Sequence, residues 1–417
     1  MTADAHAAIN AVYRIESPRL IAGLARIVRD VGVAEELAQD ALVIALVEWP
    51  KSGIPDNPGA WLMAVAKNRA INLVRRNQLA DRKHRELAIE AIEARKDMAA
   101  DEDALDDKVG DDLLRLVFIA CHPVLSTEAR VALTLRLLGG LTTIEIARAF
   151  LVPEATVAQR IVRAKRTLSE KRVPFELPPR SELGARLASV LEVIYLVFNE
   201  GYSATAGDDW MRPALCEDAL RLGRVLAELA PSEPEVHGLV ALMEIQASRS
   251  AARVGPSGEP ILLFDQDRTR WDRLLIRRGL AALERAEALG DPGPYTLQAA
   301  IAACHARANT SEETDWVRIV ELYAKLVLIT PSPVVELNRA VALSMAYGPA
   351  AGLEHVDKLT AEKSLERYHL FPTVRGDLLA KLGRFEEARA EFERAAALTQ
   401  NARERELLLE RARNCGH

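Results

Sequence analysis

The sequence predicts an all-α protein with more than one core. Apolar residues recur at helical spacing along most of the chain, and strand-like alternation is scarce. The carboxy-terminal half is rich in Ala, Leu, Glu and Arg, with Pro and Gly at the ends of segments. With 417 residues, 49% hydrophobic and 27% charged, the chain is long enough for two or three cores.

Residues 141–171 (LTTIEIARAFLVPEATVAQRIVRAKRTLSEK) predict two short amphipathic helices joined by a tight turn. Thr142 is expected to cap the first helix, with Glu145 reaching back to it as a capping box. Ile144, Ala147 and Phe150 or Leu151 are expected on one apolar face of this helix. The pattern is typical of a helix-turn-helix, although a helical hairpin with a solvated basic face is the simpler alternative.

The second helix of this pair is expected to have Pro153 just inside its start, where the missing N–H costs nothing. Val157, Ile161 and Ala164 are expected to point inward. Amides and guanidinium groups on the other face suit the edges and phosphates of a DNA major groove. The candidate residues for this contact are Gln159, Arg160, Arg163, Lys165 and Arg166.

A second basic segment lies upstream, in residues 57–85. Residues 67–85 carry seven Lys or Arg and one acid, Asp81, although the whole chain has a formal charge of −6. An exposed helix made soluble by arginine would explain the charge alone. Nucleic acid also explains the accompanying aromatic and amide residues, because these stack on bases or reach base edges.

Between these segments, residues 97–112 (DMAADEDALDDKVGDD) hold eight acids and one cation. This composition is typical of a flexible, solvated linker. An alternative is that the acidic strip imitates DNA and lies in a basic channel of a partner or against the helix-turn-helix.

The residues that follow are expected to form helix pairs. The Pro-bearing segment VPFELPPRSEL (173–183) marks the junction. Helices expected near Pro294, Pro333 and Leu365 approximate the ~34-residue period of tetratricopeptide repeats. The clearest copy carries small and aromatic residues at the repeat's spacing, namely Gly376, Gly383, Ala388, Phe392 and Ala395. We expect three to five pairs stacked as a solenoid.

The sequence gives little support for a catalytic or metal-binding site. Glu200 and Asp265 would be an acid/base pair in an enzyme, but no nucleophile, Gly-rich phosphate loop or ligand spacing accompanies them. We expect helix caps and buried ion pairs around 199–202 and 265–272, with a ligand or peptide groove as the intermediate option. Four scattered cysteines without a signal peptide predict reduced thiols in the cytoplasm. No metal, cofactor or catalytic residue is expected.

Over roughly residues 10–175 the chain resembles the extracytoplasmic-function type of bacterial RNA polymerase sigma factor. Asp30 followed by AEELAQDALVIAL (34–46) is similar to the region-two helix that binds the polymerase clamp. AWLMAVAKNRAINLVRR (60–76) is similar to the segment that melts the promoter and reads the minus-ten element. The helix-turn-helix is similar to region four, which reads the minus-thirty-five element.

The resemblance implies roles for individual residues. Ala158 departs from the pattern, because many relatives have Lys or Arg there, so their promoter preference is not carried over. The polymerase contacts implied are Glu36, Gln39 and Asp40. The minus-ten contacts implied are Trp61, Asn68, Arg69, Asn72, Arg75 and Arg76. The minus-thirty-five contacts implied are the five residues of the second helix named above.

The chain also resembles a sigma subgroup with a carboxy-terminal tetratricopeptide-like extension. The resemblance rests on FIACHPVLS (118–126), YLVFNEGYSA (195–204), LFDQDRTRWDRLLI (263–276) and SPVVELNRAVAL (332–343). It implies that the extension governs sigma activity, with a small DGPF-type protein or another regulator as a partner.

We therefore expect two helical sigma domains followed by a TPR-like α-solenoid. The expected divisions are region two (1–85), an acidic linker (86–112), region four (113–175) and the extension (176–417). The expected partners are core RNA polymerase and promoter DNA, with no membrane, since no apolar run reaches the ~20 residues of a span. The alternatives are a ligand- or partner-sensing helix-turn-helix regulator that is not a sigma subunit, and a tetratricopeptide scaffold that retains an inactive sigma core.

Overall fold

The structure is a computed structural model that describes residues 2–86, 105–150, 152–204, 206–207, 210–256 and 258–415. The expectation of an all-α protein is confirmed: in these ranges the strands are limited to two segments of two residues each. The chain divides into two compact units, residues 1–193 and 194–417. None of the described helices is both long and apolar enough to cross a bilayer.

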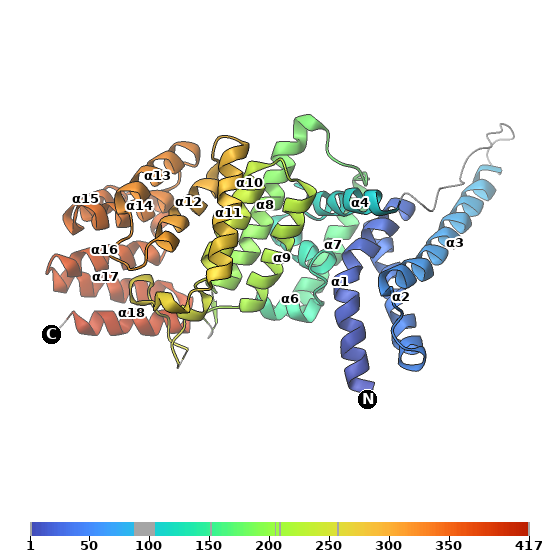
Figure 1. The fold of residues 1–417 in the computed structure, drawn as a ribbon, viewed down its shortest axis with the longest axis horizontal. Helices are drawn as coiled ribbons and strands as arrows, with labels where there is room; N and C mark the ends of the chain where they lie inside the picture. Colours follow the sequence, from blue (N-terminus) through green and yellow to red (C-terminus); the bar gives the residue numbers. More distant parts are fainter. Residues whose placement is uncertain are drawn as a thin grey trace. The chain divides into compact units, whose positions relative to one another are not determined.

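The first unit begins with three helices that pack on one another, α1 (Thr2–Val28), α2 (Val31–Ser52) and α3 (Pro58–Glu86) (Figure 1). The Asp30 carboxylate starts α2 by accepting a hydrogen bond from the Val33 amide at 3.0 Å. Small side chains on one face of α2 then let its neighbours approach closely. These fully buried residues are Ala34, Ala38, Ala41 and Ala45.

Four helices complete the first unit before the junction. They are α4 (Leu105–Ala120), α5 (Thr127–Leu137), α6 (Thr143–Ala149) and α7 (Glu154–Glu170). The start of α4 differs from the expected linker: residues 105–112 of the acidic segment are helical, and residues 87–104 lie outside the described part. Asp112 is held in place by Arg26 of α1 and Arg115 of its own helix, and its side chain is only 4% exposed.

The second unit is a succession of helices in which sequence neighbours pack together. It starts within α8 (Arg180–Tyr202), whereas the sequence predicted a division at residue 176. The remaining helices are α9 (Pro213–Leu229), α10 (Pro234–Ala247), α11 (Arg273–Leu289), α12 (Pro294–Arg307), α13 (Trp316–Ile329), α14 (Pro333–Tyr347), α15 (Pro349–Lys358), α16 (Leu370–Lys381), α17 (Phe385–Leu398) and α18 (Ala402–Asn414).

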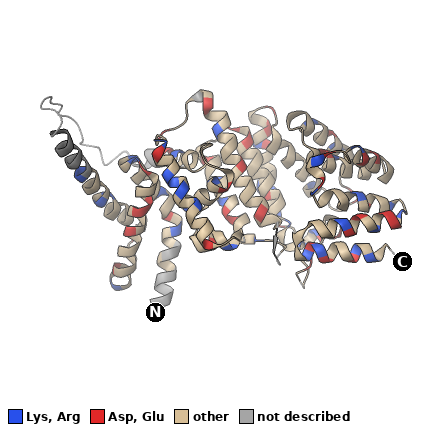
Figure 2. Ribbon diagram, turned by 180° about the vertical axis from the view of Figure 1, so that it is seen from behind, with Lys and Arg blue, Asp and Glu red and all other residues tan. Residues whose placement is uncertain are grey.

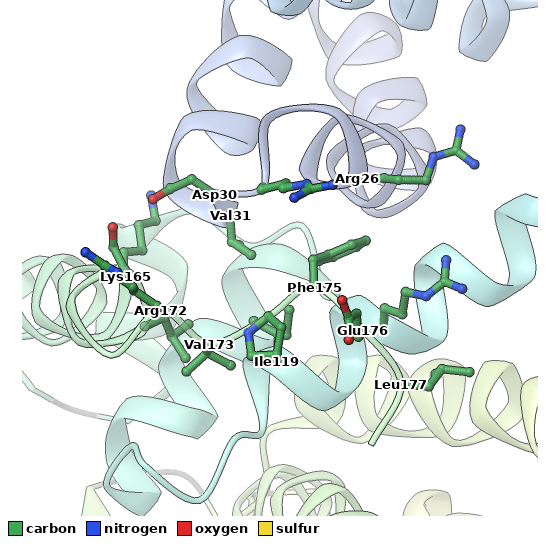
Figure 3. Close-up of a pocket in the computed structure, with 15 residues that line it drawn as sticks. Arg26, Asp30, Val31, Ile119, Lys165, Arg172, Val173, Phe175, Glu176 and Leu177 are labelled. Carbon is green, nitrogen blue, oxygen red and sulfur yellow. The ribbon is translucent and has the colours of Figure 1, made fainter. Parts of the chain in front are cut away.

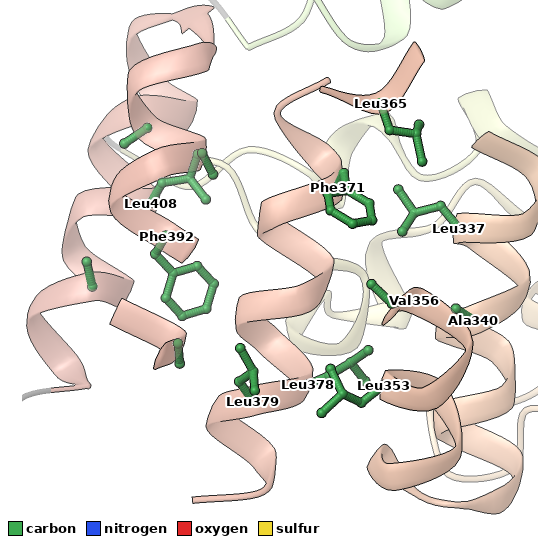
Figure 4. Packing of buried hydrophobic residues seen from close by; sticks show 14 residues of the cluster. Leu337, Ala340, Leu353, Val356, Leu365, Phe371, Leu378, Leu379, Phe392 and Leu408 are labelled. Carbon is green, nitrogen blue, oxygen red and sulfur yellow. The ribbon is translucent and has the colours of Figure 1, made fainter. Parts of the chain in front are cut away.

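The helix pair α16–α17 forms where the repeat-like residues lie. Ala388, Phe392 and Ala395 are buried on α17. Gly376 of α16 lies against the Phe392 ring, so a Cβ there would come within 3.0 Å of a ring carbon. Apolar side chains from α14 to α18 close the core around this pair (Figure 4). Gly376, Ala388 and Ala395 thus have the packing role that their spacing predicted. Gly383 does not: it is exposed, its φ is +75°, and a Cβ there would meet no atom within 4 Å.

The two ends of the second unit meet. Strand β1 (Ala206–Gly207), which follows α8, pairs in parallel with β2 (Gln400–Asn401), which precedes α18. Asn401 is 1% exposed, donates from Nδ2 to the Ala204 carbonyl at 3.1 Å and caps α18 through the Glu404 amide. A contact between residues almost 200 positions apart therefore closes the helical succession on itself.

Candidate nucleic-acid interface

Helix α3 presents a continuous polar face. Its start is capped by Asn57, which accepts from the Ala60 amide at 3.0 Å. Leu62, Ala66 and Ala70 are buried at helical spacing and fix the inner face against α1 and α2. Five of the six predicted minus-ten contacts are exposed as a result. They are Asn68, Arg69, Asn72, Arg75 and Arg76.

Trp61, the sixth, is placed differently. Its ring is half-buried and meets Trp49 of α2 edge-on, with ring centroids 5.2 Å apart and an interplanar angle of 63°. Trp49 is itself 3% exposed. The packed ring therefore fixes α3 to α2 in this conformation and is not a free platform for a base.

Helix α2 carries an exposed stripe beside this face. Glu36 and Asp40 are exposed as predicted, and Val43 and Val47 continue the same face at 59% and 56% exposed. The two valines were not predicted from the sequence. The steps of four, three and four residues from Glu36 through Asp40 and Val43 to Val47 do indicate one helical face. Gln39 instead turns inward, and its Nε2 donates to Glu35 at 2.6 Å.

An ion pair joins the stripe to the basic face. Arg69 Nη1 lies 2.6 Å from Asp40 Oδ2, and both side chains are about half exposed. Exposed pairs of this kind contribute little stability because water screens them. The pair therefore holds the two side chains near each other without preventing either from changing partner.

The helix-turn-helix has the predicted internal geometry. Thr142 accepts from the Glu145 amide at 3.2 Å, and Glu145 accepts from the Thr142 amide at 2.7 Å, so the capping box is confirmed. The prediction for Ile144 is wrong, because this side chain is 46% exposed. The buried face of α6 is formed by Ile146 and Ala147 instead.

Helix α7 follows a short turn. Pro153 occupies the residue before its first turn, one position earlier than predicted. The predicted inward residues are all buried, at 1%, 6% and 2% exposed for Val157, Ile161 and Ala164. They pack on α5 and α6, so the opposite face is directed away from the domain's core.

The outer face of α7 carries most of the predicted minus-thirty-five contacts. Gln159, Arg163 and Arg166 are exposed, and Arg160 is half-buried. Arg166 also pairs within the helix, with its Nε 2.6 Å from Glu170 Oε1. Between these polar groups Val162 is 64% exposed, an apolar contact candidate that the charge-based prediction overlooked.

Lys165 departs from this outer face. Its ammonium contacts Glu35 of α2, and Arg136 Nε lies 2.6 Å from the same carboxylate. The Glu35 side chain is 4% exposed. Burial alone would raise the pKa of Glu35, but Lys165 and Arg136 outweigh it and hold the pKa below its ordinary value. In this conformation Lys165 is thus engaged with the α1–α3 bundle and not available to a phosphate.

Further contacts tie the α1–α3 bundle to the α4–α7 bundle. Gly140, with φ of +68°, lies against Arg14 of α1, where a Cβ would come within 3.1 Å of the Arg14 carbonyl oxygen. Arg14 also lies 3.9 Å from Glu145 of α6, and Arg26 lies 3.3 Å from Asp112 of α4. We call this packed state the closed arrangement.

Outside this face, two thiols are buried, and the polar clusters form ion pairs and helix caps. Burial raises the pKa of Cys121 to about 11 and that of Cys216 to about 12. Among the described residues no group of His, Cys, Asp and Glu has the arrangement of a metal site. In the second unit Glu200 pairs with Arg212, both largely buried, and Asp272 caps α11, as the interpretation by caps and ion pairs predicted.

Comparison with family models identifies the class of the first unit. Residues 12–80 match sigma-70 region 2, and residues 115–168 match sigma-70 region 4. Residues 186–287 match a family of unknown function, DUF6596. The first two matches cover the helices that carry the exposed amide and cation faces.

Relatives extend this classification. An uncharacterized protein of Rhizobium meliloti, R00370, is 45% identical over 392 residues, covering 93% of this chain and 91% of that protein. The ECF RNA polymerase sigma factor SigK of Mycobacterium sp. (strain KMS) is 28% identical over 37% of this chain and 77% of its own length. The probable ECF sigma factor SigI of Mycobacterium tuberculosis is 27% identical over 42% of this chain and 59% of its own length. No solved structure was found to match.

The fold and the two matched regions therefore define a sigma-70 protein. The chain belongs to one family with the Rhizobium protein, and its own first unit carries sigma-70 regions 2 and 4, similar to those of extracytoplasmic-function sigma factors. From here on, α1–α3 are called region two and α4–α7 region four.

Proposed function

We propose that this protein binds core RNA polymerase through the exposed stripe of α2 and reads a promoter with α3 and α7. The stripe places two exposed valines next to two acids, and this arrangement fits an apolar contact with a polar rim. The α3 face supplies amides and guanidinium groups for the minus-ten strand. The α7 face supplies Gln159, Arg160, Arg163 and Arg166 for the minus-thirty-five element.

The closed arrangement has to open for this work. Elements named minus ten and minus thirty-five lie about 25 base pairs apart, or about 85 Å at ~3.4 Å per base pair. Here Lys165 of α7 contacts Glu35 of α2, and Arg69 of α3 contacts Asp40, only five residues further along α2. Five helical residues rise about 7.5 Å. Two reading helices held this close cannot reach both elements at once.

The second unit is proposed to regulate this opening as a TPR-like solenoid, in the cytoplasm. The α16–α17 packing supports the repeat assignment. Helix α8 begins in the first unit, where Arg130 of α5 donates to Ser189 and lies 3.1 Å from Glu192. Helix α8 thus runs without a break from the first unit, which would be regulated, into the second unit, which would regulate it. A DGPF-type small protein or another regulator is the proposed partner of the solenoid.

In vitro transcription with purified core polymerase tests the proposal. The wild-type chain is expected to give discrete starts on genomic fragments, and Asp40→Arg is expected to lose polymerase binding and transcription together. Glu48→Arg is the matched control, because Glu48 is exposed on α2 but off the stripe. DNA binding without transcription by the wild-type chain would refute the sigma role and favour the regulator.

Truncations separate the role of the second unit. A chain ending at residue 176 removes Ser189 and Glu192 and so strips α8 from region four, whereas a chain ending at residue 202 keeps these contacts. If the second unit restrains region opening, the 202 truncation transcribes more than the full chain. If it assists polymerase recruitment, the same truncation transcribes less.

A further inference from the structure

A cavity of about 700 Å³ opens at the seam between region two and region four, inside the first unit (Figure 3). Its walls come from the end of α1, the start of α2, α4, the end of α7 and the segment that follows α7. The size is in the range of small-molecule sites. We call it the seam cavity.

The lining is rich in cations, but most of these already have partners. Arg26 and Arg115 share the Asp112 carboxylate, and Lys165 contacts Glu35. Two cations remain: the exposed side chains of Arg29 and Arg172 make no ion pair with any residue in the described ranges. One comes from region two and the other from region four.

The backbone at these two arginines is unusual. Arg29 has φ of 56° and Arg172 has φ of 49°, and they are the only non-glycine residues with positive φ in the described part of the chain. Arg29 directly follows α1, and Arg172 is the second residue after α7; at the ends of helices glycine is the residue that adopts this conformation at least cost. The chain keeps arginine at both places despite the strain, and such strain is typical of ligand sites.

The remaining walls are apolar. Val31, Ile119, Leu168 and Phe175 line the cavity, and Figure 3 places the Phe175 ring between Ile119 and Arg26. The two acids in the lining do not cancel the free cations. Asp30 is engaged as the cap of α2, and within the described ranges Glu176 forms no ion pair with Arg29 or Arg172.

We propose that the seam cavity binds a small phosphorylated ligand with an aromatic or apolar body, and that this ligand holds the two regions together. Arg29 and Arg172 would bind its phosphates from opposite sides, since guanidinium groups favour bidentate contacts to phosphate. The apolar wall would hold its body. A ligand that contacts both regions favours the closed arrangement over the open one, so it opposes the opening that reading both promoter elements requires. This second step rests on the proposed function.

Calorimetric titration of the full chain tests the site directly. ATP is the probe with both features, inorganic triphosphate has only the charge, and adenosine has only the aromatic body. We expect saturable binding of ATP, weaker binding of triphosphate and none of adenosine. Arg29→Gly and Arg172→Gly are each expected to weaken ATP binding about tenfold or more, because each removes a charge-assisted contact.

Glycine makes these variants informative about folding. It adopts positive φ without strain, so neither substitution is expected to lower Tm. Arg19→Ala removes an exposed cation of α1 outside the cavity and is expected to bind ATP as the wild type does. Absence of ATP binding overturns the proposal, and so does ATP binding that survives in the folded double variant Arg29→Gly/Arg172→Gly.

Coupling to promoter binding is measured separately. At ATP about tenfold above its own Kd, the apparent Kd of the complex with core polymerase for promoter DNA is expected to rise by up to about tenfold for the wild type and to stay unchanged for the double variant. Equal effects on both chains overturn the coupling. Failure of either chain to bind polymerase without ATP counts against the sigma role instead, while the titration still decides the site.

Discussion

Helices α3 and α7 are the two candidate DNA readers, and they differ in how much of their polar face is free. On α3 all five amides and arginines predicted for the minus-ten strand are exposed. On α7 Lys165 is turned into a buried ion pair with Glu35 of region two. The closed arrangement therefore hides part of the minus-thirty-five reader while leaving the minus-ten face open. Figure 2 marks the Lys and Arg positions along α3.

This difference comes from one buried carboxylate. Glu35 is buried and faces two cations from region four, Arg136 and Lys165. Removing one partner of a buried pair leaves an uncompensated charge, which costs about 3–5 kcal/mol. Glu35 is thus the residue through which the packing of the two regions is most easily broken.

Among the substitutions considered, Glu35→Gln is expected to have the largest effect on how much of the α7 polar face is free. It leaves Arg136 and Lys165 without their carboxylate, and the closed arrangement should lose about 3–5 kcal/mol. Hydrogen exchange of α2 and α7 should accelerate, and Lys165 should become available to DNA. Glu36→Gln, the exposed neighbour, is the matched control and should leave exchange unchanged. Equal exchange in the two variants would show that Glu35 does not hold the regions.

Arg75→Ala tests the open reader. Because Arg75 is exposed on α3, its loss should weaken promoter binding by about 1–3 kcal/mol and lower the salt slope by about one. Arg69→Ala should cost less, since Arg69 already pairs with Asp40 at 2.6 Å. Affinity titrations at several salt concentrations measure both effects. A larger loss for Arg69 than for Arg75 would contradict the assignment of the free face.

Two substitutions on α7 distinguish a cation that is exposed from one that is engaged with region two. In the full chain without polymerase, Arg163→Ala should weaken DNA binding about tenfold, whereas Lys165→Ala should change it little because Lys165 is engaged with Glu35. In a Glu35→Gln background the two substitutions should have similar effects. Equal losses in both backgrounds would mean that Lys165 is free in solution.

The smallest effect expected is a dependence of stability on pH. Burial, and then Arg186, lower the pKa of His122 to about 4, and its Nδ1 accepts from the Val124 amide at 3.0 Å. The unfolded chain binds this proton near pH 6.5, so stability should fall as pH drops from about 6.5 toward 4. His305, with a pKa lowered to about 3, acts in the same direction in the second unit.

His122→Asn isolates the first contribution. Asparagine keeps an acceptor but does not titrate, so Tm of region four should depend less on pH between 7 and 5, while the His305 contribution remains. The Glu35 ion pairs should persist over the same interval, because a carboxylate with a lowered pKa is lost only as pH falls through that lower value. Differential scanning calorimetry measures the change, and an unaltered profile would contradict it.

Local features of the candidate site were predictable from the sequence. The capping box at Thr142, the buried positions of α7 and the exposed face of α3 follow from residues within a few turns of one another. Helical periodicity and capping are short-range effects, and one sequence contains them in full.

What the sequence could not predict depends on distant partners. Glu35 and Arg136 are 101 positions apart, and nothing near Lys165 indicates that a carboxylate of α2 will hold it. Trp61 was predicted as a minus-ten contact, and its packing against Trp49 could not be foreseen because Trp49 belongs to another helix. The acidic run was predicted to be a linker up to residue 112, but its last eight residues belong to α4, and Asp112 there forms ion pairs with Arg26 of α1 and with Arg115.

The separation of the two regions is the most direct test of this account. Spin labels at Lys51→Cys on α2 and Glu154→Cys on α7, both exposed positions, report it by pulsed electron resonance after Cys304 and Cys415 are replaced by serine. The closed arrangement predicts a single, narrow distribution of distances in the free chain and a shift of several tens of ångströms when core polymerase and a transcribed promoter are added. An unchanged distance in a sample that transcribes would contradict it.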